Sequence, residues 1–257
     1  MRKRSDIKGY IFCHKKVDYG IWDNKLYTPL EVGAALRDEH CAELQDNTGD
    51  NVSDWNEILA ENTGTYWIWK NKPKNTKYVL QCQYRRRLLF DENTDFDSIF
   101  QKYDVIVPQP LKVLYGLKAQ YIACHSKSDI ELAEKVVKEL EPEHSEDWDR
   151  FIKNGRYIYY SNGFVMRNKD YNAYAKWLFT VFDRFREKKG WNSPEDVMKE
   201  VQYDISKQRR SGVKGFKYQS QILAFLSERL FTYYILSRFD QSRIFTLPYI
   251  KFENISI

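Results

Sequence analysis

The segment Thr76-Lys-Tyr-Val-Leu-Gln-Cys-Gln-Tyr-Arg-Arg-Arg-Leu-Leu-Phe90 places a short apolar stretch directly before three arginines. Residues 78–82 are largely apolar and β-prone, and they predict a buried strand. Arg85, Arg86 and Arg87 stand just beyond its carboxyl end, which is the edge where open α/β sheets bind ligands. Guanidinium groups suit phosphate there, because they donate paired, charge-assisted hydrogen bonds and stay protonated. The alternative is a solvated basic turn.

The composition is that of a folded protein. The chain has 257 residues, 42% of them hydrophobic and 16% aromatic, which is enough to bury a full core and excludes a disordered chain. Lys and Arg number 41 against 36 Asp and Glu, and both signs are interspersed. Nucleic-acid binders usually concentrate a basic excess on one face or tail. A mildly basic chain can still contact an anionic membrane surface.

The cysteines and the chain's first residues point to a cytoplasmic protein. Cys13, Cys41, Cys82 and Cys124 are widely spaced and form no Cys-x-x-Cys pair, so reduced thiols are expected and no zinc site is recognised. The first residues lack the apolar run of a signal peptide, and the sequence has no apolar span of membrane length. The sequence therefore predicts a soluble protein with no bound metal.

Strands and helices alternate up to about residue 190. The predicted strands are 9–13, an extended piece at 27–33, 78–82, 103–107, and 157–160 with 164–166 around a break at Ser161-Asn162-Gly163. The predicted helices are one of about 58–69 that ends at Lys72-Pro73, then 129–140, 169–188, one that starts at Pro194, and 218–238. Ser53 or Asp54 is expected to cap the first helix, and residues 141–149 to form an acidic loop.

This order predicts an α/β sandwich with helical additions. We expect a single domain over residues 1–257, with an α/β nucleotide-sugar-binding core at about 8–190 and a helical C-terminal portion at about 191–257.

The sequence lacks several enzyme signatures. No Gly-x-Gly-x-x-Gly follows the first strand, where His14, Lys15 and Lys16 stand instead, and the two lysines are either surface residues or ligands. A Walker A loop, a Gly-x-Ser-x-Gly elbow and a His-Glu-x-x-His motif are also absent. The Asp-x-Asp pair with which many sugar-nucleotide transferases hold a metal is replaced by Gln83-Tyr84-Arg85-Arg86. Arginines there could supply the positive charge that a metal would otherwise supply to a departing diphosphate.

Two tryptophans and one glutamate are further candidates. Trp67 and Trp69 cannot both face one side of a helix, so one is expected in the core and the other on a crevice wall. Glu228 is the only charge in one apolar row of the last helix. It is either ion-paired in the core or exposed into a cleft, where burial would raise its pKa toward that of a general base.

Taken in order, these motifs resemble one bacterial family of capsular and exopolysaccharide biosynthesis glycosyltransferases, long listed under a domain of unknown function and including galactofuranosyltransferases. The resemblance spans about residues 8–250. It rests on residues 9–15, Tyr27-Thr-Pro-Leu-Glu-Val-Gly33, Asp46-Asn-Thr-Gly-Asp-Asn-Val-Ser53, Asn56, Glu61-Asn-Thr63, Tyr66-Trp-Ile-Trp-Lys-Asn71, Tyr84-Arg-Arg86, Ser161-Asn-Gly-Phe-Val165 and Phe225-Leu-Ser-Glu-Arg-Leu230.

The resemblance implies a GT-A-like, Rossmann-related fold and transfer of a sugar from a nucleotide donor, with UDP-galactofuranose the best single expectation. Gln83 stands where the family usually has histidine, and Gly163 where it has methionine. Carried over position by position, the donor site comprises His14, Lys15, Asp50, Asn51, Tyr84, Arg85, Arg86, Asn162 and Arg229.

The leading hypothesis is a metal-independent, inverting glycosyltransferase that acts on a surface polysaccharide or its lipid-linked precursor. Arg85 and Arg86 would hold the diphosphate, Glu228 would be the catalytic base, and Trp67 or Trp69 would stack on the acceptor sugar. The donor is expected to be UDP-linked, and no other cofactor is expected. The protein is expected in the cytoplasm or at the inner face of the cell membrane. The alternatives are a nucleic-acid-binding or processing protein and a catalytically inactive sugar-binding module.

Overall fold

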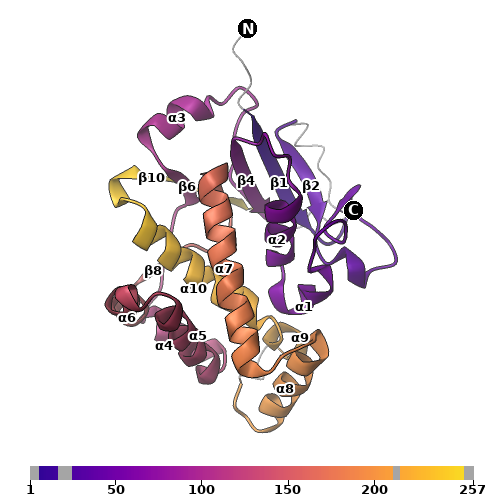
Figure 1. The fold of residues 1–257 in the computed structure, drawn as a ribbon, viewed down its shortest axis with the longest axis vertical. Coiled ribbons are helices and arrows are strands. Elements are labelled where there is room, and N and C mark those ends of the chain that lie inside the picture. The colour runs from indigo at the N-terminus through magenta and orange to yellow at the C-terminus, as the bar shows by residue number, and fades with distance from the viewer. Residues whose placement is uncertain (1–5, 17–24, 211–214, 252–257) are drawn as a thin grey trace.

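The structure, a computed structural model, describes residues 6–16, 25–210 and 215–251. These residues form a mixed α/β fold with a central sheet, as the sequence predicts (Figure 1). The strands of the main sheet are β1 Ile7–Cys13, β2 Tyr27–Glu31, β3 Leu44–Gln45, β4 Tyr78–Gln83, β5 Arg86–Arg87, β6 Val105–Pro108, β9 Phe164–Arg167, β10 Ile244–Leu247 and β11 Ile250–Lys251. A separate two-stranded ribbon pairs β7 Leu111–Lys112 with β8 Tyr157–Ile158.

The order of the strands fixes where a ligand can bind. The main path runs β10-β6-β9-β4-β1-β2-β3, with β1 parallel to both β2 and β4, and β9 antiparallel to β4. From β1 the chain first builds outward to β2 and β3, then returns to the other side of β1 as β4. The order therefore reverses between β1 and β4, and the crevice at such a switch point is where α/β sheets bind ligands.

Helices cover both faces of this sheet. They are α1 Asn56–Leu59, α2 Asn62–Asn71, α3 Phe96–Lys102, α4 Leu117–Cys124, α5 Lys127–Leu140, α6 Ser145–Asn154, α7 Asn168–Lys189, α8 Pro194–Ser206, α9 Gly215–Gln219 and α10 Ile222–Arg238. Helix α3 lies on one face and most of the others lie on the opposite face. In Figure 1 the long helix α7 runs through the middle of the molecule, with α2 on one side and α10 on the other, and it packs against both. Within the described residues, no helix is both long and apolar enough to cross a membrane.

Strand residues alternate between two apolar layers. Tyr10 and Phe12 of β1 point into the larger core under the helices, whereas Ile11 and Cys13 point into a smaller core on the opposite face. This is the two-residue period of a strand with both faces covered. The smaller core includes Phe96 of α3. Burial on both faces explains why the strand sequences are almost continuously apolar.

Some local predictions are wrong. Residues 145–154 form helix α6 rather than an acidic loop, and they bury Trp148 against the core. The first helix is interrupted at Ala60, whose φ is 46°, so that α1 and α2 are separate. Ser53 caps neither, because its hydroxyl donates to Asp46 Oδ1 at 2.5 Å and accepts from the Ala35 amide.

The C-terminal portion is mostly helical, as predicted, but its last described strands return to the sheet. β10 joins β6 in parallel and β11 pairs with β5. The predicted helix at 218–238 is split at Ser220 and Gln221 into α9 and α10. The strand predicted around residues 161–163 does break there, but its two halves, β8 and β9, lie in different sheets.

Candidate active site

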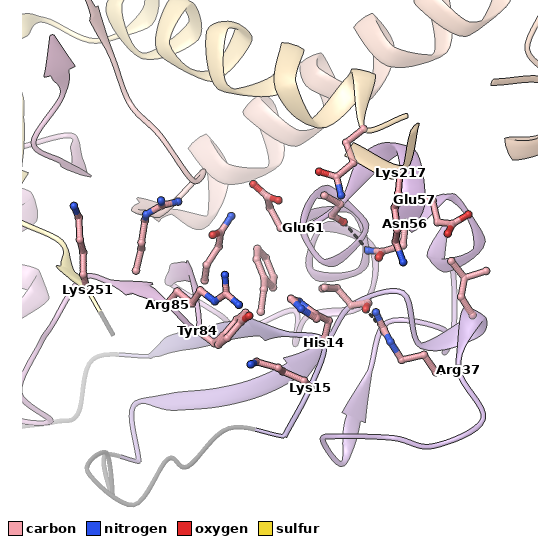
Figure 2. Close-up of a pocket in the computed structure, with 17 residues that line it drawn as sticks. His14, Lys15, Arg37, Asn56, Glu57, Glu61, Tyr84, Arg85, Lys217 and Lys251 are labelled. Atoms are coloured by element: carbon pink, nitrogen blue, oxygen red, sulfur yellow. Dashed lines mark hydrogen bonds between the residues drawn. The ribbon is translucent and has the colours of Figure 1, made fainter. Parts of the chain in front are cut away.

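A cavity of about 820 Å³ opens at the carboxyl ends of β1, β2 and β4 (Figure 2). His14 and Lys15 follow β1, Arg37 follows β2, and Tyr84 and Arg85 follow β4. The complete lining is Phe12, His14, Lys15, Val32, Leu36, Arg37, Asn56, Glu57, Ala60, Glu61, Gln83, Tyr84, Arg85, Arg86, Lys217, Gln221 and Lys251. The cavity thus lies at the switch point of the sheet, where His14 and Tyr84 meet edge to face with ring centroids 5.2 Å apart.

Basic side chains surround this cavity. Lys15, Arg37, Arg85, Arg86, Lys217 and Lys251 all belong to its lining. Figure 2 shows Arg37 and Lys217 on one side of the opening, Lys251 on the other, and Arg85 between them. So many cations around one hollow favour an anionic ligand of several charges, and a guanidinium fork binds phosphate oxygens in pairs.

His14 lies among these cations as a neutral ring. Its pKa is lowered first by burial and then by the charges of Arg37, Arg85, Lys15 and Lys217. A fifth positive charge beside these four cations is unfavourable, so the imidazole is uncharged near neutral pH. It can donate a hydrogen bond from one ring nitrogen and accept one at the other.

Glu61 is the acidic residue at the inner wall of the cavity. It lies at the start of α2, and Figure 2 shows its carboxylate pointing into the space between the basic residues. Burial raises its pKa, while hydrogen bonds from Asn162 and Gln83 and the charge of Arg86 act in the opposite direction. The Asn162 amide donates to Glu61 Oε1 at 3.1 Å.

A second carboxylate, Glu228 of α10, lies behind the lining. Its side chain is 17% exposed, and Arg229 Nη1 lies 3.3 Å from Oε2. Burial raises the pKa of Glu228 to about 7; the charge of Glu61 raises it further, whereas Arg229, the Ser161 amide and Arg86 lower it. Two neighbouring carboxyl groups with raised pKa values are typical of catalytic sites, although ion-pair networks can also perturb pKa values.

The turn at Ser161 and Asn162 joins these groups. Both residues have positive φ, 70° and 45°, a conformation uncommon outside glycine and held where surrounding contacts demand it. The Ser161 amide donates to Glu228 Oε1 at 3.2 Å, and its hydroxyl accepts from Arg86 Nη1 at 2.8 Å. Gln81 Nε2 donates to the Asn162 carbonyl at 2.8 Å. One strained turn therefore positions an arginine and two glutamates.

The structure brings some predicted site residues together and leaves others apart. His14, Lys15, Tyr84, Arg85 and Arg86 all line the cavity. Asn162, Glu228 and Arg229 lie directly behind it and are linked to Glu61 and Arg86 through the contacts described above. Arg87 is fully buried and its Nε donates to the Tyr84 carbonyl at 3.1 Å, so it holds the turn after β4.

Asp50 and Asn51 are not part of the cavity. The Asp50 carboxylate accepts from the Tyr66 hydroxyl at 2.9 Å and lies 3.7 Å from Lys70 Nζ, and the Asn51 amide donates to the Gly49 carbonyl. The loop that carries them is tied to the outer side of α2. Asp50 and Asn51 therefore lie outside this cavity, and their role in donor binding stays a prediction.

The two tryptophans are also absent from the lining. Trp67 is buried in the core, and its ring N–H donates to the Thr48 carbonyl at 3.0 Å. Trp69 is partly buried and stacks on Phe179, with centroids 5.9 Å apart. The core position of one tryptophan is as predicted, but neither lies on the crevice wall. Trp69 packs α2 against α7, whereas Trp67 packs edge to face against Tyr10 of β1.

Five charged lining residues were not among the predicted site residues: Arg37, Glu57, Glu61, Lys217 and Lys251. Glu61 could have been found, because it opens the Glu61-Asn-Thr63 motif and follows a helix break at Ala60. Arg37 follows the αL turn at Gly33, just after a predicted extended segment. Lys217 and Lys251 come from distant parts of the chain and carry no local signal. Within the described residues, no group of three His, Cys, Asp or Glu side chains is gathered as a metal site.

Comparison with known proteins agrees with this fold. The model of the family described as "Domain of unknown function (DUF4422)" matches residues 8–202. Among solved structures, the apo form of WbbM, a bifunctional glycosyltransferase, is similar with a TM-score of 0.71 and 22% sequence identity. The match covers 96% of this chain but only 45% of that one. The search of curated proteins gave no match.

Proposed function

The chain belongs to the family described as a domain of unknown function, DUF4422, and from this membership and the geometry of the cavity we propose that it is a glycosyltransferase. The observation that carries the proposal is the combination, in one cavity, of six cations with a partly buried glutamate at its inner wall whose pKa is raised. A nucleotide sugar needs both: positive charge for its diphosphate and a base for the attacking acceptor hydroxyl. The similarity of fold to WbbM, a glycosyltransferase, supports the same reaction class.

The donor in this proposal is a nucleoside diphosphate sugar, with UDP-galactofuranose the first to test. Its diphosphate lies against Arg85 and Arg86 at the carboxyl end of β4, near Lys15. As the bond between sugar and phosphate breaks, these cations stabilise the negative charge that grows on the leaving diphosphate. The reaction needs no metal to do this, because arginines occupy the position after β4 where many sugar-nucleotide transferases have an Asp-x-Asp pair.

Glu61 is the base of the reaction in this proposal. The sequence favours Glu228, but Glu61 lines the cavity and Glu228 does not. The Glu61 carboxylate accepts the proton of the acceptor hydroxyl while that oxygen attacks the anomeric carbon, in one displacement that inverts the configuration. Its raised pKa makes it a better proton acceptor than an ordinary carboxylate. Glu228, held by Arg229 and Ser161, is the second carboxyl group of the pair and lies behind Glu61.

The acceptor is a surface polysaccharide or its lipid-linked precursor, as the family resemblance implies, and the reaction takes place on the cytoplasmic side of the membrane. The site of its sugar is the open part of the cavity near Glu61. Neither Trp67 nor Trp69 can stack on it there, because both pack elsewhere.

A nucleic-acid-binding protein is the alternative from another class. Its cations would form a stripe on an open face along which phosphates could track. In this protein the basic residues after β1, β2 and β4 converge on one cavity, which suits a small anion better. An inactive sugar-binding module would share the fold and the cavity, so that only turnover distinguishes it.

The experiment is a transfer assay with a panel of UDP-sugars and a lipid-linked saccharide acceptor, run in EDTA and read by mass spectrometry of the product. Transfer in EDTA is the expected result. Transfer only on addition of a divalent ion would overturn the metal-free mechanism. Donor binding without transfer or hydrolysis would favour the inactive module, and salt-sensitive binding of random RNA without any effect of UDP would favour the nucleic-acid alternative.

A further inference from the structure

A second surface, away from the cavity, exposes apolar side chains in one stretch of chain. Leu114 is 88% exposed and Tyr115 is 70% exposed, the two largest values among the exposed large hydrophobic residues of the described chain. Leu111 before them, Ile122 after them and Tyr157 on the paired strand are exposed as well. Soluble proteins rarely gather exposed apolar side chains in this way without a partner for them.

The fold holds this stretch in place. The Val113 amide donates to the Arg156 carbonyl at 2.7 Å, and the Leu117 amide donates to the Gly155 carbonyl at 3.2 Å. Val113 and Leu117 are both buried, so Leu114 and Tyr115 form the tip of a loop that is pinned at each side. The conformation of the apolar tip is therefore fixed by its attachment to the β7–β8 ribbon.

Gly116 keeps this tip close to α6. A Cβ at Gly116 would lie 2.3 Å from the Lys153 carbonyl oxygen, so a side chain there would push the tip away from the helix. Glycine is needed because of this close approach of two backbone segments.

Two cations flank the apolar tip. Lys112 of β7 and Arg156, which precedes β8, are both exposed, and within residues 6–16, 25–210 and 215–251 neither makes an ion pair. Arg156 Nη1 donates to the Leu114 carbonyl at 2.9 Å, which places its positive charge directly behind the tip. Exposed apolar side chains beside cations without an ion-pair partner are complementary to an anionic bilayer surface. The apolar side chains can insert among the lipid chains while the cations contact the anionic headgroups.

We propose that this surface, formed by Leu111, Lys112, Leu114, Tyr115, Ile122, Arg156 and Tyr157, docks the protein on an anionic membrane. Tyrosine is favoured at membrane interfaces because its ring is apolar and its hydroxyl stays wet. The exposed Lys112 and the Arg156 guanidinium bound to the Leu114 carbonyl favour an anionic bilayer as the occupant of this surface. The proposal does not depend on the activity proposed above.

The surface is physically connected to the candidate active site. It continues into α4, where Gln120 accepts a hydrogen bond from Arg229 of α10, and Arg229 contacts Glu228 at 3.3 Å.

The test is co-sedimentation of the full chain with vesicles of phosphatidylcholine alone or mixed with phosphatidylglycerol. We expect binding to the mixed vesicles, a loss of at least tenfold in Leu114→Ser/Tyr115→Ser, and roughly a fivefold loss in Lys112→Gln, which is about the effect of one cation near an anionic surface. Tyr203→Ser is the matched control, because Tyr203 is exposed and has Lys207 and Arg209 beside its ring. It should bind as the wild type does.

Absence of binding by the wild type, or equal binding by the double variant, would overturn the proposal. So would a dimer in light scattering that becomes a monomer in the double variant while vesicles have no effect, since a second copy of the chain would then cover the tip. Circular dichroism melting checks that the variants fold. UDP-induced stabilisation, measured without vesicles, should be unchanged in them, so the docking surface and the proposed activity can fail separately.

Discussion

Two clusters of charged side chains in this protein differ in how their carboxylates are paired. At the junction of α5, α7 and α8, the fully buried Asp129 receives both ends of the Arg210 guanidinium, and Lys189 Nζ lies 3.1 Å from the same carboxylate. At the cavity, Glu61 receives an amide of Asn162, and Glu228 has one arginine contact at 3.3 Å. The first cluster pairs its buried carboxylate bidentately. In the second cluster, the carboxylates have neutral hydrogen-bond donors and one arginine at 3.3 Å, with no bidentate pair among the described residues.

The pKa values follow from this difference. Burial raises the pKa of Glu61 and of Glu228, the latter to about 7, because the surrounding hydrogen bonds and charges do not offset the loss of water. Arg210, in contrast, has its pKa raised by the charge and hydrogen bonds of Asp129, although burial opposes this. A cluster that neutralises itself stabilises the fold, whereas one that keeps carboxylates ready to exchange protons suits catalysis.

The largest effect is expected from Glu61→Gln. If Glu61 is the base, transfer should fall by about 100- to 10,000-fold, which is the usual contribution of a general base, while UDP affinity changes less than twofold. Steady-state transfer rates and UDP titration measure the two quantities. Glu57→Gln, in the same lining, is the control and should stay within a few-fold of wild type. A fully active Glu61→Gln protein would return the role to Glu228.

Arg210→Met tests the other cluster. It removes the bidentate partner of the buried Asp129 and leaves Lys189 beside it, so we expect a loss of about 3–5 kcal/mol in the free energy of unfolding, as is typical when one partner of a buried ion pair is removed. Guanidinium denaturation gives this value. Arg209→Met changes a neighbouring arginine that is 62% exposed and should have little effect. A stable Arg210→Met protein with impaired UDP binding would mean that the two clusters are not separate in function.

Glu228→Gln should change how stability depends on pH. The raised pKa of about 7 means that the fold favours the neutral carboxyl; this stabilisation is complete below the ordinary value of 4.5 and is lost as pH rises through about 7. Glutamine stays neutral at every pH. The free energy of unfolding of the variant, relative to that of wild type, should therefore rise by at most about 3 kcal/mol between pH 5 and 8, at roughly 1.4 kcal/mol for each pH unit. Melting curves across that range provide the test. A difference that does not vary with pH would contradict the raised pKa.

The smallest effect is expected from Asp50→Asn. Asp50 is more than half exposed and its partners Tyr66 and Lys70 lie on the outer side of α2. UDP affinity should therefore remain within twofold of wild type in a titration. A tenfold loss of UDP affinity would mean that the loop of residues 46–52 belongs to the donor site and that this site extends beyond the cavity.

Much of the sheet was predictable because its strands carry a local signal. Residues 78–82 are apolar and short, and the structure extends them by one residue to Gln83. Arg85 and Arg86 could be placed at the cavity because the end of a strand is a position that the sequence itself defines. The predicted α/β class and GT-A-like architecture are those observed. The reason is that strand ends and helix periods depend on neighbours in sequence.

The parts that were not predictable depend on long-range contacts. Lys217 and Lys251 reach the cavity only because α9 and β11 pack against it, and nothing near them in sequence indicates this. The acidic residues 141–149 read as a loop because the pattern of charges hides the buried Trp148. One of Trp67 and Trp69 was expected on a crevice wall, but Trp67 is buried and Trp69 stacks on Phe179, more than a hundred residues away in sequence.

The most direct test of the account is the affinity of UDP, measured by titration calorimetry for wild type, for Arg85→Met/Arg86→Met, and for Arg150→Met, whose arginine is 71% exposed on α6. If the cavity at the ends of β1 and β4 holds a nucleoside diphosphate, the wild type and Arg150→Met should bind UDP alike. The double variant should bind it at least tenfold more weakly, with an unchanged melting temperature in the absence of ligand. No binding by the wild type, or equal binding by the double variant, would contradict the account.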